Sequence, residues 1–102
     1  YYILMELKEL TKRIKNFQEI RFKSYNSNLT SELIFIHLTE EIGEIARQIF
    51  NKNSNMRNYD ETNLKEEIAQ SVLDLMVLAE LNDMDLEKEI ELKIKSMEDK
   101  WN

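Results

Sequence analysis

Two short polar strips carry the side chains best able to do chemistry. In chain order, their members are Glu40, Glu41, Glu44, Glu67, Gln70 and Asp74. Spacings of three and four residues place the members of each strip on one side of a helix. Carboxylate and amide oxygens are the ligands that Mg²⁺ and Mn²⁺ prefer, and the chain offers no cysteine and only one histidine to softer metals. Two such strips that face each other predict a divalent cation site, and protein-bound Mg²⁺ commonly contacts substrate phosphates.

Each strip can also be interpreted as purely structural, without a catalytic role. The first strip has the composition of a solvated acidic face, which is what most charge runs are. The second lies between two apolar sides of one expected helix, and a helix that is apolar on two sides is usually buried on two sides. A carboxylate there needs a partner, because burying it unpaired is costly. That partner is either a metal cation, or amide and basic side chains that form hydrogen bonds or ion pairs with the carboxylate.

The elements that must position these strips are helices. The chain has no proline and one glycine in 102 residues, whereas sheets need turns built from such residues. Apolar periodicity predicts four helices, over residues 3–22, 31–50, 63–81 and from 86 onward. The expected caps are Thr30 or Ser31, Asn63 with Glu66, and Asp85. Residues 51–60 are expected to form a polar loop. The prediction is a single all-α domain, residues 1–102, folded as a four-helix bundle protomer.

Composition narrows the possible partners. A net charge of −6 argues against binding to a nucleic-acid polymer, whose phosphates attract basic surfaces. No apolar run approaches the roughly 20 residues of a membrane span, and the absence of cysteine favours a cytoplasmic setting. The second apolar side of the 63–81 helix exceeds what a lone chain of this size needs, which predicts a homodimer or homotetramer.

Three segments resemble one known family. Residues 40–44, Glu-Glu-Ile-Gly-Glu, resemble the E-E-x-x-E motif of the all-α nucleoside triphosphate pyrophosphohydrolases, which include MazG and the dimeric dUTPases. Residues 66–70, Glu-Glu-Ile-Ala-Gln, stand where that family has E-x-x-D. Residues 84–87, Met-Asp-Leu-Glu, resemble its G-[IV]-D-L-E segment. The order and spacing of these motifs extend the resemblance over residues 25–101.

The resemblance implies an activity and an assembly. Family members are helical bundles that form dimers or tetramers and use Mg²⁺, with Mn²⁺ as an alternative. They cleave a nucleoside triphosphate between the α- and β-phosphates, releasing a nucleoside monophosphate and pyrophosphate. By resemblance, Glu41, Glu44 and Glu67 are metal ligands, and Glu40 is a further ligand or the group that activates water. The catalytic carboxylates are then Glu40 and Glu41.

The substrate-binding residues expected from the same comparison are Tyr25, His37, Lys93 and Met97. Tyr25 falls where some relatives place an aromatic residue that stacks on the base. His37 lies one helical turn before Glu41 on the same side, where it either touches the site or serves as a structural residue. Lys93 stands where many members have a lysine, and Met97 where they often have a polar residue near the phosphates.

Gln70 departs from the family pattern, because it replaces the aspartate of E-x-x-D. An amide oxygen still ligates Mg²⁺ but brings no charge. Asp74, one turn further along the same strip, is a possible substitute ligand. A second hypothesis therefore keeps the fold and drops the catalysis, leaving a weakened or inactive nucleotide-binding or helical interaction module. Gly43 is equally compatible with close helix packing and with room for substrate.

Overall fold

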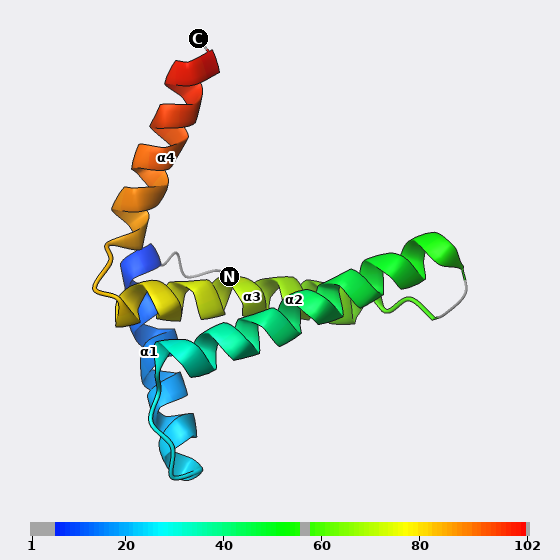
Figure 1. Cartoon of the computed structure of the whole chain (residues 1–102), viewed down its shortest axis with the longest axis horizontal. Helices are drawn as coiled ribbons and strands as arrows, with labels where there is room; N and C mark the ends of the chain where they lie inside the picture. The colour runs from blue at the N-terminus through cyan, green and yellow to red at the C-terminus, as the bar shows by residue number, and fades with distance from the viewer. Residues whose placement is uncertain (1–5, 56–57, 102) are drawn as a thin grey trace, which may run out of the picture.

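The structure is a computed structural model that describes residues 6–55 and 58–101. Its helices are α1 (Leu7–Ser24), α2 (Ser31–Ser54), α3 (Glu61–Leu81) and α4 (Leu86–Trp101), as Figure 1 shows. The described residues contain no strand. The prediction of an all-α protomer with four helices is therefore confirmed. The expected start of the first helix at Ile3 lies outside the described residues.

Helix α2 begins where the sequence predicts and ends later. The hydroxyl oxygen of Thr30 accepts a hydrogen bond from the backbone N–H of Leu33 at 3.3 Å, which confirms the expected N-cap. The expected end at Phe50 was wrong, because the helix continues for another turn. Asn51 is buried there, and its side-chain amide donates to the backbone oxygen of Asn58 at 3.2 Å. This contact with the following segment compensates for the low helix propensity of asparagine.

The expected cap of α3 at Asn63 was also wrong. Asp60 is the N-cap, and its Oδ1 accepts the backbone N–H of Asn63 at 3.0 Å. Aspartate and asparagine cap helices about equally well, so the choice depends on tertiary contacts. The side-chain oxygen of Gln48, on α2, accepts the backbone N–H of Asp60 at 3.0 Å and fixes that residue at the helix start.

The link between α3 and α4 follows the prediction. Helix α3 ends at Leu81, and Oδ1 of Asp85 accepts the backbone N–H of Lys88 at 3.2 Å. Asp83 has a φ of 56° in this link, in the left-handed region that glycine adopts without a steric penalty. Asn26 and Asn55 have similar positive φ angles of 54° and 55°. Asparagine and aspartate thus provide the left-handed turn residues of a chain with one glycine.

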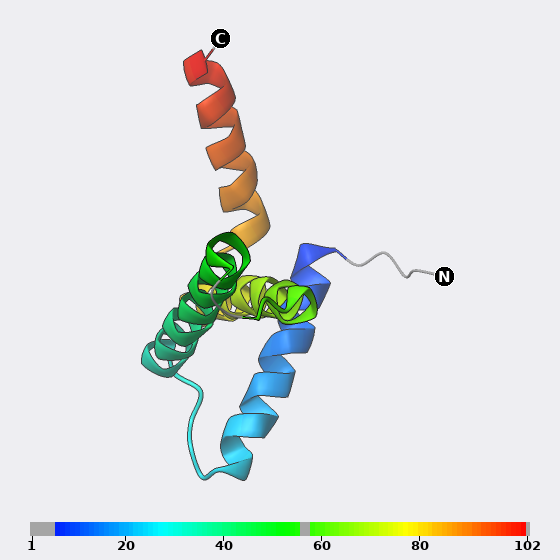
Figure 2. The same ribbon diagram turned by 90° about the vertical axis from the view of Figure 1, so that its right-hand side faces the viewer.

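The core lies between α2 and α3, which run side by side as a helical hairpin (Figures 1 and 2). The buried apolar side chains are Ile34, Leu38, Met76, Val77 and Ala79. Helix α1 crosses α3, whereas α4 points away from the hairpin and contacts the rest of the chain near its own start (Figure 2). None of the described helices combines the length and apolar character that crossing a lipid bilayer requires.

The four helices are arranged openly. The radius of gyration is 16.4 Å, compared with about 13 Å for a compact domain of 100 residues. On α3, the side chains of Ile68, Val72 and Leu75 are about half exposed. On α4, Ile94 and Met97 are exposed to a similar degree. One of the two apolar sides of α3, that of Ile68, Val72 and Leu75, is therefore left partly uncovered by the chain's own helices.

Candidate functional site

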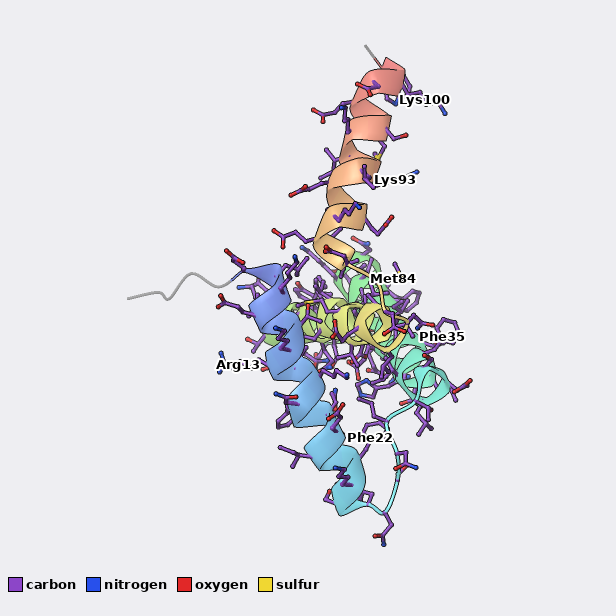
Figure 3. All side chains as sticks on the ribbon, turned by 90° about the vertical axis from the view of Figure 1, so that its left-hand side faces the viewer. Arg13, Phe22, Phe35, Met84, Lys93 and Lys100 are labelled. Carbon is purple, nitrogen blue, oxygen red and sulfur yellow. The ribbon has the colours of Figure 1, made fainter. Side chains whose placement is uncertain are left out.

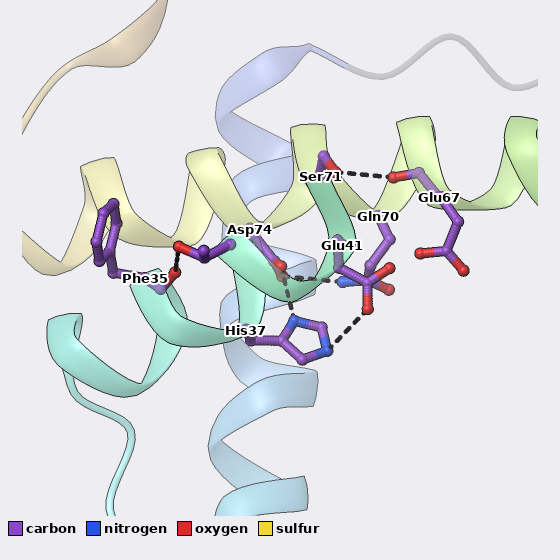
Figure 4. Close-up of polar contacts among 8 residues, drawn as sticks. Phe35, His37, Glu41, Glu67, Gln70, Ser71 and Asp74 are labelled. Atoms are coloured by element: carbon purple, nitrogen blue, oxygen red, sulfur yellow. Dashed lines mark hydrogen bonds and ion pairs between the residues drawn. The ribbon is translucent and has the colours of Figure 1, made fainter. Parts of the chain in front are cut away.

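A hydrogen-bonded network connects the two polar strips across the α2–α3 hairpin (Figure 4). Asp74 of α3 is fully buried. One of its carboxyl oxygens accepts the Nδ1–H of His37 at 2.7 Å, and the other accepts the side-chain N–H of Gln70 at 2.9 Å. The other ring nitrogen of His37, Nε2, lies 3.4 Å from a carboxyl oxygen of Glu41. His37 therefore links the buried Asp74 to the half-buried Glu41, and whether it also contacts substrate stays a prediction.

Glu67 provides a buried oxygen without a partner. Its Oε2 is inaccessible to solvent and accepts no hydrogen bond from any described residue. The hydroxyl of Ser71 donates at 2.9 Å to the backbone oxygen of Glu67, so it does not satisfy the carboxylate. Figure 4 shows Glu67 on α3 and Glu41 on α2, the two helices of the hairpin. A buried, unpaired carboxylate oxygen is costly and is suited to a cation.

The remaining acidic residues of the first strip lie further out. Glu40 is exposed. The side chain of Glu44 is 44% exposed, and its carboxylate lies 3.9 Å from the guanidinium of Arg47 on the next turn. The structure joins Glu41, Gln70 and Asp74 of the predicted residues through His37. Glu67 lies one turn before Gln70 on α3, Glu40 is exposed and Glu44 is partly exposed.

The candidate substrate residues divide into two groups. Tyr25 and His37 line one pocket of about 250 Å³ between the end of α1 and the start of α2. Lys93 and Met97 lie on α4, which makes no contact with α2, and Figure 3 shows Lys93 on the projecting helix. A single chain thus places Tyr25 in the same pocket as His37, which contacts Glu41, but leaves Lys93 and Met97 apart.

The donor set fits a hard divalent cation. Within residues 6–55 and 58–101, no three acidic or histidine side chains are already arranged to hold a metal ion. Magnesium does not need such a cluster, because it usually keeps several waters and binds one or two carboxylates together with substrate phosphates. Glu41 on α2 and Glu67 on α3 are the two candidate carboxylates for such a cation. Both oxygens of Asp74 are already engaged by His37 and Gln70, which favours an orienting role for that residue.

Gln18 is a pocket residue that the sequence did not reveal. It lies on α1, is 2% exposed and lines the same pocket as Tyr25 and His37. Its Oε1 is buried and has no hydrogen-bond partner among the described residues. The only sequence signal is that Gln18 follows Thr11, another buried polar residue of α1, by seven positions.

Comparison with solved structures identifies the fold. The chain aligns with the crystal structure of the Bacillus-conserved MazG protein, a nucleotide pyrophosphohydrolase, with a TM-score of 0.72. The alignment covers 94% of this chain and 93% of that chain, at 20% sequence identity. The chain has the MazG fold. The resemblance inferred from the motifs is thereby confirmed at the level of the fold. No family model and no curated protein sequence matches the chain, so the MazG fold is recognised here through the motifs and the structure.

Proposed function

We propose that this chain is a Mg²⁺-dependent nucleoside triphosphate pyrophosphohydrolase that releases a nucleoside monophosphate and pyrophosphate. The observation that supports this best is the unpaired, buried Oε2 of Glu67, which lies in the α2–α3 hairpin with Glu41. The MazG fold supports it further, since the aligned protein is described as a nucleotide pyrophosphohydrolase.

Glu41 and Glu67 would hold the cation, with the side-chain oxygen of Gln70 as a neutral neighbour. Its amide N–H is bonded to Asp74, which leaves the oxygen free of that bond. A bound Mg²⁺ neutralises phosphate charge and increases the acidity of an attacking water. Mn²⁺ would serve similarly, because it also prefers oxygen ligands.

The other residues of the network orient these carboxylates. Asp74 accepts the Nδ1–H of His37 and so holds the imidazole with Nε2 directed at Glu41. Glu40, exposed beside Glu41, is the candidate general base that takes the proton of the attacking water. Glu44, one turn beyond Glu40, is a further candidate ligand that would have to leave Arg47.

Self-association as a homodimer or homotetramer belongs to the same proposal. A second copy of the chain would cover the half-exposed apolar side chains of α3 and α4. Since α4 does not contact α2 of its own chain, Lys93 and Met97 would reach the phosphates only at the site of another subunit. The lysine would there add positive charge beside the triphosphate.

The second candidate is a nucleotide-binding or helical interaction module without turnover. Gln70 favours it, because the residue brings no charge and its amide is bonded to Asp74. This candidate predicts nucleotide affinity without pyrophosphate release.

Pyrophosphate release from a panel of nucleoside triphosphates, with Mg²⁺ or Mn²⁺, tests the two candidates. The hydrolase predicts metal-dependent release that falls at least about a hundredfold in Glu41→Gln and Glu67→Gln. Glu9→Gln, which neutralises an exposed glutamate of α1, is the matched control and should retain activity. Gln70→Asp should increase turnover, because it restores a charged oxygen. Nucleotide binding without release by the wild-type chain would contradict the hydrolase.

A further inference from the structure

The two halves of the α2–α3 hairpin are held together differently. Among the described residues, every buried apolar side chain of the hairpin lies near the start of α2 or in the second half of α3. On the loop side of Glu41, the buried side chains of α2 are those of Gln48 and Asn51, each 7% exposed. On α3, no described residue before Ser71 is buried. Polar contacts, rather than a buried apolar cluster, therefore connect the helices in the loop half.

Two hydrogen bonds make up this connection, which we call the loop clamp. The Oε1 of Gln48 accepts the backbone N–H of Asp60 at 3.0 Å, and the side-chain amide of Asn51 donates to the backbone oxygen of Asn58 at 3.2 Å. Apolar contact is non-directional and tolerates sliding, whereas a hydrogen bond requires a defined distance and angle. Because Asp60 is the N-cap of α3, the loop clamp fixes where α3 begins relative to α2.

The loop clamp also sets which turns of the two helices lie level. Glu41 comes seven residues before Gln48, and Glu67 comes seven residues after Asp60. Seven residues are close to two helical turns, or roughly 10.5 Å along each helix. Helices α2 and α3 run antiparallel (Figure 1), so both steps lead away from the clamp in the same direction. Counted from the clamp, Glu41 and Glu67 therefore lie level along the hairpin.

A bond further along the hairpin gives an independent measure of this register. His37 bonds to Asp74 at 2.7 Å. A step of four residues from each leads to Glu41 on α2 and to Gln70 on α3. The two counts differ by three residues, which is less than one helical turn. Glu41 is therefore level with the turn of α3 that carries Glu67 and Gln70.

We propose that Gln48 is a positioning residue of the cation site, because its bond to Asp60 maintains the register that keeps Glu41 and Glu67 level. This inference rests on the proposed function, since it assumes that the two carboxylates share a cation. Mg²⁺ lies about 2.0–2.1 Å from its oxygen ligands, whereas a slip of one helical turn moves a side chain by about 5.4 Å. A loosened register therefore separates the two carboxylates while both helices stay folded.

Distances between spin labels test the register directly. The chain has no cysteine, so Ala46→Cys on α2 and Ala69→Cys on α3 place one label on each helix, both at exposed positions. Dilution with unlabelled protein restricts pulsed double electron–electron resonance to pairs within one chain. The labelled wild type should give one narrow distance distribution. Gln48→Leu has a side chain of similar size but no acceptor, so it should broaden the distribution at least about twofold or add a second distance.

Mn²⁺ affinity, measured with a non-hydrolysable nucleoside triphosphate analogue, tests whether the register matters to the site. Gln48→Leu should weaken it at least about tenfold, although Gln48 is not a ligand. Asn51→Ala removes the other bond of the loop clamp and favours the helix, so it decides the question if Gln48→Leu does not fold. It should change both measurements in the same direction. Thr30→Ala is the matched control, because it removes the N-cap at the opposite end of α2. It should lower the thermal unfolding temperature and leave both measurements within about twofold of wild type.

Three results would overturn the positioning role. The first is a distance distribution that stays unchanged in Gln48→Leu and Asn51→Ala. The second is a broadened distribution with unchanged Mn²⁺ affinity, and the third is an equal loss of Mn²⁺ affinity in Thr30→Ala and Gln48→Leu. Absence of Mn²⁺ binding by wild type, together with a broadened distribution in Gln48→Leu, would instead refute the proposed cation site and leave the control of the register by Gln48 standing.

Discussion

At the scale of single residues, the buried Asp74 is the centre of the polar network. Its carboxyl oxygens accept hydrogen bonds from His37 and Gln70. Asp74→Ala removes both acceptors, and each partly buried donor left unpaired costs about 1–3 kcal/mol. We expect the variant to lose at least about 2 kcal/mol of unfolding free energy in urea denaturation. A loss below about 0.5 kcal/mol, which is typical of surface positions, would contradict this account of the network.

Gly43 offers a second test at this scale. A Cβ built on this residue meets no other atom within 4 Å, so the described chain does not use Gly43 for close helix packing. Alanine is favoured over glycine by about 1 kcal/mol inside a helix. Gly43→Ala should therefore increase the unfolding free energy by about that amount. A stability loss would show that a second subunit packs closely against α2 at this point, and lower nucleotide affinity would assign the open space to substrate.

Which polar residues share one side of a helix could be predicted from the sequence. The hydrogen bonds that these residues form with other helices could not. Spacings of three and four place Glu41 beside His37, and this requires only helical geometry. The bond between His37 and Asp74 joins residues 37 positions apart, and it depends on how α2 and α3 are aligned along each other. Gln18 was missed for a similar reason. The apolar periodicity of α1 marks Phe17, which is 59% exposed, whereas the buried neighbour is Gln18.

At the scale of elements, we expect substitutions of two aspartates in the turn between α3 and α4 to change the stability of the chain in opposite directions. Asp83 has a positive φ, where a side chain is strained and glycine is not. Asp83→Gly should stabilise the chain by about 0.5–1 kcal/mol. Asp85 caps α4 through the N–H of Lys88, and Asp85→Ala should destabilise it by about 1 kcal/mol. Thermal unfolding of the two variants checks both signs, and a stability loss in Asp83→Gly would be inconsistent with backbone strain at that residue.

Helix ends were predicted where a local cap decides them. Thr30 and Asp85 cap their helices through bonds to residues three positions away, which the sequence shows directly. The end of α2 and the start of α3 depend instead on contacts between segments. Asn51 bonds to Asn58, and Gln48 bonds to Asp60. Local propensity does not contain these contacts, so both boundaries were placed wrongly.

At the scale of the whole molecule, the open arrangement of the helices predicts self-association. Ile90 and Ile94 lie one turn apart on α4, and both are more than 40% exposed. Sedimentation velocity at micromolar concentration should show a dimer or tetramer. Ile90→Glu combined with Ile94→Glu should shift the protein toward monomer, because it places charges where apolar contacts are expected. Glu89→Gln combined with Glu91→Gln is the control on the same helix. A wild-type monomer would contradict the proposed assembly.

The fold class was predictable from composition, whereas the direction of α4 was not. The lack of proline and the single glycine exclude most turn-rich folds, and the apolar periodicity then requires helices. How α4 leaves the hairpin depends on surfaces beyond its own sequence, since its side chains from Lys88 to Lys100 are exposed in the single chain.

The shared cation of Glu41 and Glu67 is the claim on which the proposed chemistry depends, and Mn²⁺ binding measures it most directly. Electron paramagnetic resonance of Mn²⁺, titrated with protein and a non-hydrolysable nucleoside triphosphate analogue, reports the bound fraction of the metal. We expect one tight Mn²⁺ site per chain that Mg²⁺ displaces and that weakens at least about tenfold in both Glu41→Gln and Glu67→Gln. Mn²⁺ affinity that is unchanged in both variants relative to wild type would contradict a cation held between α2 and α3.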